Sequence, residues 1–155
     1  MCEVLFVPVV RGPLLLTFFD SCVPAGFPSP ADDHQGMKLD LNQLLLPNPD
    51  SSYLVRVMGD SMTGGESGIR DGALLAVDCH LEARPDDVVI AVVEGQFTVK
   101  RLVKRKGENW FLVPDNPSYP EIPINEPDLF DVWGVVTHVL TETRRGRLSA
   151  HVRVS

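Results

Sequence analysis

The chain has 155 residues, of which 44% are apolar and 23% charged, and this composition predicts one globular domain with a single hydrophobic core. Thirteen prolines and twelve glycines favour short strands joined by turns and exclude an all-helical bundle. The formal net charge of -7 excludes autonomous binding to nucleic acid, which depends mainly on the neutralisation of phosphates, so we expect protein partners.

The first 25 residues are predicted to be an arm that packs on the folded body or on a second subunit. Residues 4–19 are apolar, but two prolines, a glycine and Arg11 interrupt them, so the run is too short for a membrane-spanning helix. A secretory signal is the alternative, because Val23-Pro24-Ala25 offers small residues for a cleavage site. The start of the chain lacks a basic residue and Arg11 lies inside the apolar run, which argues against export.

Residues 26–50 are predicted to be a linker followed by a short helix. Residues 21–36 are dense in Pro, Gly, Ser and Asp, which is typical of an extended segment. Asp40 and Gln43 have the spacing of a capping pair, and Pro47 ends the apolar run that follows. We therefore expect one or two helical turns after Asp40.

Residues 51–141 are predicted to be an all-β domain. Runs rich in Val, Ile, Phe and Trp are separated by turn residues and cover 53–58, 73–78, 88–93, 97–103, 110–113 and 132–140. Glu94-Gly95 is predicted to be a tight hairpin turn. Strands joined by short connections imply a mostly antiparallel sheet that is closed or folded on itself. Residues 142–155 contain four arginines and are predicted to be a flexible basic tail.

The three cysteines lie far apart, and the four histidines are scattered singly without the spacing of metal ligands. We therefore expect no metal and no other cofactor. An odd number of separated cysteines argues against a disulfide framework and favours a reducing compartment, so the predicted location is cytoplasmic.

Ser61 and Lys100 are the candidates for chemistry. Ser61 enters a glycine-rich turn, where a nucleophilic hydroxyl and an oxyanion hole of backbone N–H groups can lie together, although serine is also common in turns for structural reasons. No histidine has a pattern that nominates it as the base. Lys100 lies in an apolar strand, where burial would lower its pKa from the ordinary value near 10.4, and the alternative is an exposed lysine like Lys104. Spacing alone does not pair the two residues.

Several ordered motifs resemble the UmuD branch of the LexA-like self-cleaving serine peptidases. They are GDSM (59–62), IRDGALLAVD (69–78), DVVIAVVEGQFTVKRL (87–102), LVPDNPSYPEI (112–122) and DVWGVVTHV (131–139), together with the linker motifs GFPSPADD (26–33) and LDLNQLL (39–45). The resemblance covers roughly residues 17–140.

This resemblance implies a LexA/signal-peptidase-like catalytic fold with a Ser-Lys dyad. By position, Ser61 matches the nucleophile, Lys100 the general base, and Ala25-Gly26 the scissile bond that makes residues 1–25 removable. The backbone N–H groups of Asp60 and Ser61 would form the oxyanion hole. The UmuD branch usually has Cys before the scissile glycine, whereas Ala25 is similar to the Ala-Gly site of LexA and phage repressors.

The resemblance also implies partners. It predicts a homodimer, self-cleavage stimulated by RecA filaments on single-stranded DNA, and a trimmed product that serves an UmuC-like Y-family polymerase subunit in error-prone SOS synthesis. The alternative is a non-enzymatic interaction module on the same fold that regulates a polymerase. A LexA-type repressor is set aside because roughly 25 residues before the cleavage site are too few for a helix-turn-helix domain.

Overall fold

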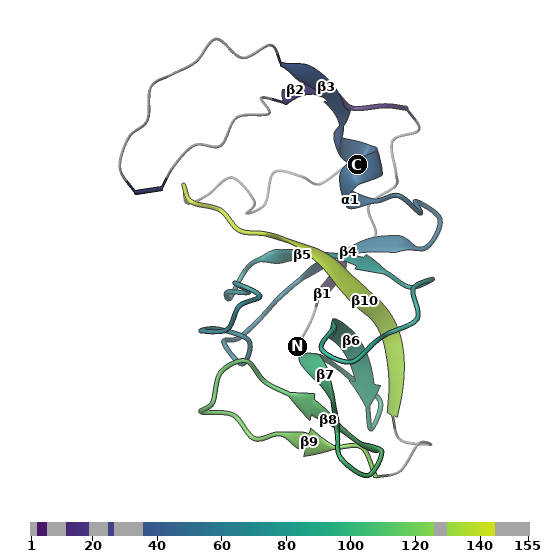
Figure 1. Ribbon diagram of the computed structural model, residues 1–155, viewed down its shortest axis with the longest axis vertical. Helices are drawn as coiled ribbons and strands as arrows, with labels where there is room; N and C mark the ends of the chain where they lie inside the picture. The colour runs from purple at the N-terminus through teal and green to yellow at the C-terminus, as the bar shows by residue number, and fades with distance from the viewer. Residues whose placement is uncertain (1–2, 6–11, 19–24, 27–35, 126–129, 145–155) are drawn as a thin grey trace.

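The computed structural model describes residues 3–5, 12–18, 25–26, 36–125 and 130–144 (Figure 1). The strands are β1 (Glu3–Leu5), β2 (Leu15–Phe18), β3 (Met37–Asp40), β4 (Ser52–Arg56), β5 (Leu74–Asp78), β6 (Val88–Val93), β7 (Gln96–Arg105), β8 (Asn109–Val113), β9 (Ile122–Pro123) and β10 (Phe130–Leu140), and the helix is α1 (Leu41–Leu45). No helix in these ranges has both the length and the apolar character needed to cross a membrane.

Eight of the strands form one antiparallel sheet in the order β1-β4-β5-β10-β6-β7-β8-β9, which confirms the predicted all-β fold. Each of the six predicted runs coincides with a strand, with ends that differ by no more than two residues. The Glu94-Gly95 turn joins β6 to β7, and both residues have positive φ, as a tight hairpin of this kind requires. Strands β1, β2, β3 and β9 were not predicted from the sequence.

Strand β10 holds the two halves of the large sheet together, because it pairs with β5 on one side and β6 on the other (Figure 1). Its register shifts between Val132 and Gly134 in the pairing with β6. A Cβ at Gly134 would lie 2.6 Å from Val77 Cγ1, so a glycine is needed where the strands approach closely.

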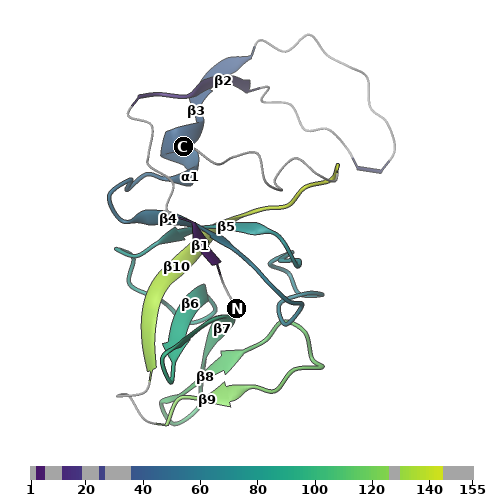
Figure 2. The ribbon, with the colours of Figure 1, turned by 180° about the vertical axis from the view of Figure 1, so that it is seen from behind.

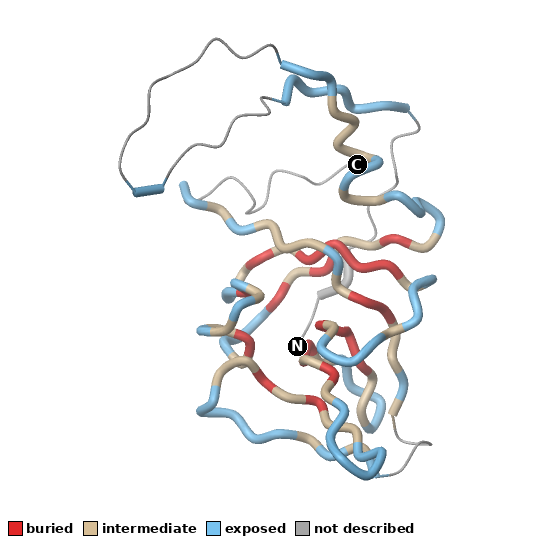
Figure 3. Tube along the Cα trace, in the orientation of Figure 1, coloured by how far each residue is buried: buried red, intermediate tan, exposed pale blue. Residues whose placement is uncertain are grey.

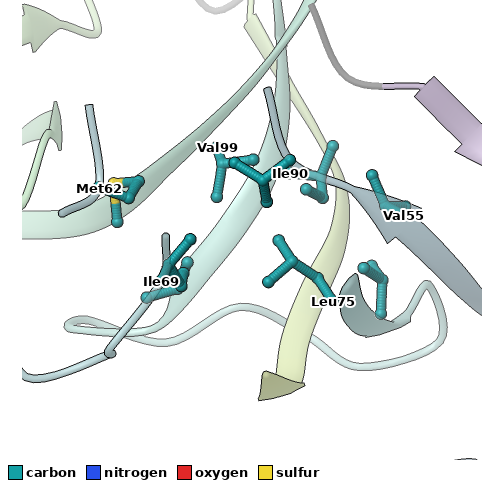
Figure 4. Packing of buried hydrophobic residues seen from close by; sticks show 9 residues of the cluster. Val55, Met62, Ile69, Leu75, Ile90 and Val99 are labelled. Carbon is teal, nitrogen blue, oxygen red and sulfur yellow. The ribbon is translucent and has the colours of Figure 1, made fainter. Parts of the chain in front are cut away.

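The core consists of two clusters, one on each face of β6, since successive residues of a strand point to opposite faces. The buried residues lie in the large sheet and the loops next to it, and none lies in β2, β3 or α1 (Figure 3). The first contains Val55, Val57, Met62, Ile69, Leu75, Val77, Val88, Ile90 and Val99, six of which are labelled in Figure 4, and the second contains Val89, Ala91, Leu102, Leu112 and Val135. Burial of each such aliphatic side chain lowers the free energy of the folded state by about 1.5–3 kcal/mol. The central strands therefore contribute much of the stability of the fold.

A second, two-stranded sheet of β2 and β3 lies with α1 at one end of the molecule, beyond β4 and β5 (Figures 1 and 2). Asp40 forms the predicted N-cap of α1, because its Oδ1 accepts from Asn42 N at 3.0 Å. The same oxygen accepts from Leu14 N at 3.1 Å and so connects the start of β2 to the helix. Part of the predicted linker (27–35) and most of the predicted tail (145–155) lie outside the described residues.

Candidate active site

Ser61 lies in the loop between β4 and β5, and apolar residues fix this loop on both sides of its glycine-rich turn. Met62 and Ile69 point into the first core cluster (Figure 4), where they are 2% and 1% exposed. Gly59 has φ +97°, a conformation that side chains disfavour, and lets the chain turn just before Ser61. The serine is half-buried at the end of this anchored turn.

Lys100 lies on β7, between β6 and β8, and only 7% of its surface is exposed. Its Nζ donates to Ser61 Oγ at 3.0 Å, although the two residues are 39 positions apart in the chain. Nζ also donates to Thr98 Oγ1 at 3.1 Å and to Val99 O at 2.9 Å. A hydroxyl within hydrogen-bond distance of a buried amine has the geometry required for proton transfer between them.

The Pro114–Tyr119 segment contacts the Ser61 loop, and the sequence indicated it only as part of the motif LVPDNPSYPEI (112–122). Asn116 N donates to Ser61 O at 3.0 Å, and Asn116 Nδ2 donates to Asp60 O at 3.0 Å. The Tyr119 hydroxyl donates to the Asp60 carboxylate, and this contact raises the pKa of Tyr119 because it favours the neutral phenol. The loop with Ser61 is therefore held by the loop that connects β8 to β9.

Asp115 connects this second loop to the strand that carries Lys100. Its two carboxylate oxygens accept from Arg101 Nε and Nη2, both at 3.0 Å, and Oδ2 also accepts from Ser67 Oγ at 2.6 Å. Burial by itself raises the pKa of Asp115, but the bonds from Arg101 and Ser67 outweigh burial and lower it. A Cβ at Gly65 would lie 2.4 Å from the Asp115 carboxylate, so this close contact requires glycine.

Ala25 and Gly26, the predicted cleavage site, are both exposed. They lie at the outer part of the connection between β2 and β3, well away from the large sheet in both views (Figures 1 and 2). A Cβ at Gly26 would have none of the described residues within 4 Å. The structure thus brings Ser61, Lys100 and Asp60 together, and it holds the predicted scissile bond apart from them.

Metal-binding side chains do not gather in the described part of the chain, where no group of three or more His, Cys, Asp and Glu residues has suitable positions. Cys79 is half-buried, and burial together with the nearby charge of Asp78 raises the pKa of its thiol. The thiol therefore stays protonated at neutral pH and is a poor nucleophile.

Known proteins resemble this chain over most of its length. Residues 17–137 match the family model described as Peptidase S24-like. Protein ImpA of Escherichia coli is 39% identical over 130 residues, which are 84% of this chain and 86% of that protein. Protein SamA of Salmonella typhimurium is 41% identical over 82% of this chain and 85% of its own, and a LexA repressor of Acidovorax sp. is 36% identical over 78% of this chain and 52% of its own. The chain belongs to the Peptidase S24-like family, as its resemblance to UmuD-like and LexA-like proteins predicted.

Proposed function

We propose that the protein is a serine peptidase that cuts its own chain between Ala25 and Gly26, with Ser61 as the nucleophile and Lys100 as the general base. The observation that carries this proposal is the 3.0 Å contact between Ser61 Oγ and Lys100 Nζ. The burial of Lys100 supports it, because an amine removed from water is less stable in its charged form. Only the neutral amine can accept the proton of the serine hydroxyl.

The reaction has two steps. Neutral Lys100 takes the hydroxyl proton of Ser61 while Oγ attacks the carbonyl carbon of Ala25, and the peptide bond to Gly26 then breaks as the proton passes to the leaving amine. This gives an ester between Ser61 and residues 1–25. A water molecule next loses its proton to Lys100 and attacks the ester, which releases the arm and restores the serine.

The charge that develops on the Ala25 carbonyl oxygen needs hydrogen-bond donors, and we assign these to the backbone N–H groups of Asp60 and Ser61. The support for this assignment is the positive φ of Gly59 and the anchoring of Met62, which together define one conformation for the turn. Donors fixed in advance stabilise the charge without a cost of reorganisation during the reaction.

Cleavage requires the arm to dock first, since Ala25 and Gly26 are exposed and apart from the dyad. A small side chain followed by glycine suits an extended segment that enters a narrow cleft. We propose that a RecA filament on single-stranded DNA favours the docked conformation, so that it acts by a shift of population. The resemblance to UmuD-like proteins supports this role for RecA.

The trimmed protein, residues 26–155, is proposed to form a homodimer that serves as the accessory subunit of a Y-family DNA polymerase in SOS mutagenesis and translesion synthesis. Loss of residues 1–25 would remove β1 from its partner β4 and β2 from its partner β3. Two strand edges would then be unpaired, and such edges are sites for pairing with another chain. Cleavage would thus expose a surface for the polymerase.

The test of the dyad is intact-mass analysis of the full chain after incubation with RecA, ATP and single-stranded DNA. We expect fragments of residues 1–25 and 26–155, and we expect none from the Ser61→Ala, Lys100→Ala and Lys100→Arg variants, because a guanidinium keeps its proton. Lys104→Ala is the matched control, since this lysine forms an exposed ion pair with Glu108 at 2.7 Å, and it should be cut normally. Cleavage of Lys100→Ala at the wild-type rate would refute the assignment.

The same assay without RecA tests the protonation of the base. The base works only as the neutral amine, so the slow spontaneous rate should rise with pH, by up to tenfold per pH unit, for as long as the amine is still losing its proton, and should then become constant. A rate that falls between about pH 7 and pH 10 while the protein remains folded would exclude a lysine base.

A further inference from the structure

We propose that Asn116 is a positioning residue that holds the nucleophile loop at a fixed distance from Lys100. This inference rests on the proposed role of Ser61 and extends it to a residue that does not touch the substrate. Asn116 lies in the Pro114–Tyr119 segment and is half-buried against the loop that carries Ser61.

Asn116 contacts both peptide groups that flank the nucleophile. Its backbone N–H donates to Ser61 O at 3.0 Å, and its side-chain Nδ2 donates to Asp60 O at 3.0 Å and more weakly to Thr63 Oγ1 at 3.4 Å. Because a peptide group is planar, its C=O and N–H directions are fixed relative to each other. Asp60 O also accepts from Thr63 N at 3.1 Å and from Thr63 Oγ1 at 2.8 Å within the loop. Asn116 adds the bond that ties this carbonyl to the second loop, and with it the direction of the Ser61 N–H, which is one of the proposed oxyanion donors.

The segment with Asn116 is itself fastened to the strand of the base. Asp115, its neighbour, accepts two hydrogen bonds at 3.0 Å from Arg101, which directly follows Lys100 on β7. Such a two-pronged pair restricts orientation as well as distance. Asp115 and Asn116 therefore form a short connection, two residues long, between the strand of the base and the loop of the nucleophile.

Asn116 also closes its own turn, because its Oδ1 accepts from Ser118 N at 3.0 Å and its carbonyl accepts from Tyr119 N at 3.1 Å. This turn places Tyr119, whose hydroxyl donates to the Asp60 carboxylate. The oxygen and the nitrogen of the asparagine amide thus have separate roles: the oxygen shapes the turn, and the nitrogen holds the nucleophile loop. A substitution that removes the nitrogen and keeps an oxygen tests the second role apart from the first.

Asn116→Asp keeps an oxygen for Ser118 N and replaces the donor to Asp60 O by an acceptor, but it also adds a negative charge. Asn116→Ala removes the donor without adding a charge, so the two variants are compared. A misplacement of reacting groups by about 1 Å can cost a factor of order a hundred in rate. We expect self-cleavage at least about tenfold slower in Asn116→Asp and Asn116→Ala. The second measurement is labelling of Ser61 by a fluorophosphonate, in which the Oγ–P bond forms, the P–F bond breaks and Lys100 takes the proton. Labelling should slow by a similar factor without any need for the arm to dock.

Asn109→Ala is the matched control, because Asn109 Nδ2 also donates to a backbone carbonyl, that of Lys106 at 3.2 Å, in the turn between β7 and β8. It should cut and label at the wild-type rate, and all variants are compared well below their melting temperatures. Wild-type cleavage and labelling in folded Asn116→Asp would overturn the inference, as would an equal loss in Asn109→Ala. If neither Asn116 variant folds, labelling of Ser61 is measured in Tyr119→Phe instead, since Tyr119 is exposed. Labelling slower by about twofold or more supports the positioning role, and labelling at the wild-type rate overturns it.

The outcomes also separate this inference from the proposed function. A wild-type chain that neither cuts itself nor labels at Ser61 would refute the dyad, and the role of Asn116 would fall with it. A wild-type chain that cuts and labels, together with an Asn116→Asp variant that does so equally fast, would leave the dyad intact and refute the positioning role alone.

Discussion

Strands β2 and β5 have similar apolar sequences and opposite surroundings. β5 contributes four buried residues out of five to the centre of the large sheet, whereas all four residues of β2 are exposed on a sheet of only two strands. Two strands alone are marginally stable in water, so β2 and β3 depend on neighbours or on further partners for their stability. Apolar composition therefore predicts a strand without predicting how firmly the strand is held.

The proposed reaction makes use of this difference. The residues assigned to the chemistry lie in the firmly packed region, where Met62, Ile69 and the strand with Lys100 fix their positions. The bond assigned to be cut lies in the loosely held region, beyond β2. Regions with little burial open at low cost in free energy, which is what a segment needs if it must leave one position and enter another.

The sharpest test of this division is Gly26→Glu, which should stop cleavage and leave folding unchanged. A glutamate at this position adds bulk and charge where the cleft must close on the arm. Its Cβ would contact none of the residues that the structure describes, since none of them lies within 4 Å of that position. Intact mass should show no fragments with RecA present, and the melting temperature should match that of Ser61→Ala. A clear drop in melting temperature would show that Gly26 packs against other residues, and the contrast between the β2 region and the large sheet would then not hold.

Two leucine substitutions measure the difference in stability between the regions. Leu75 on β5 is fully buried, so Leu75→Ala should lower the free energy of unfolding by about 2–5 kcal/mol. Leu16 on β2 is 46% exposed, so Leu16→Ala should change it by no more than about 0.5 kcal/mol. Urea denaturation in the Ser61→Ala background keeps the chain intact during both measurements. A large loss in Leu16→Ala would mean that a second subunit covers β2 in solution.

Sequence reasoning succeeded where structure depends on local pattern. The six β runs and the N-cap at Asp40 follow from alternation, turn residues and capping preference, and each has the predicted position. The strands β1, β2 and β3 were missed because they pair with partners far along the chain, such as Glu3 with Arg56, and prolines around them are typical of a linker.

In the candidate site, too, contacts between residues far apart in the chain could not be predicted from local pattern. Ser61 and Lys100 were each recognisable as candidates, but their contact depends on how β7 lies beside the Ser61 loop, and spacing along the chain carries no such information. Asn116 was missed because asparagine in a Pro-Asp-Asn-Pro segment is fully explained by turn formation. The signal that could have identified it is the concentration of polar residues in a turn next to an otherwise apolar strand.

Substitution of Asp78 should have the smallest effect on stability, and it tests how the β2 and β3 region is joined to the large sheet. Its buried carboxylate accepts from Asn48 Nδ2 at 2.7 Å, from Ser51 Oγ at 3.1 Å and from His80 N at 2.8 Å, and it thereby ties the segment between α1 and β4 to β5. Burial alone raises the pKa of Asp78, but these hydrogen bonds outweigh burial and lower it below the ordinary value of 3.8. A carboxyl group with a lowered pKa in the folded state stabilises the fold above its unfolded pKa. That contribution is lost as the pH falls below about 4 and through the folded value.

Asp78→Asn should therefore reduce the free energy of unfolding by about 1 kcal/mol at pH 7, and the difference from the wild type should shrink as the pH falls towards 3. Urea denaturation at both pH values measures this change, again in the Ser61→Ala background. Asp50→Asn is the control, because Asp50 is an exposed carboxylate in the same segment and its loss should change stability by less than about 0.5 kcal/mol at either pH. A deficit in Asp78→Asn that is equal at pH 7 and pH 3 would show that the packing of the side chain, and not its charge, joins the two regions.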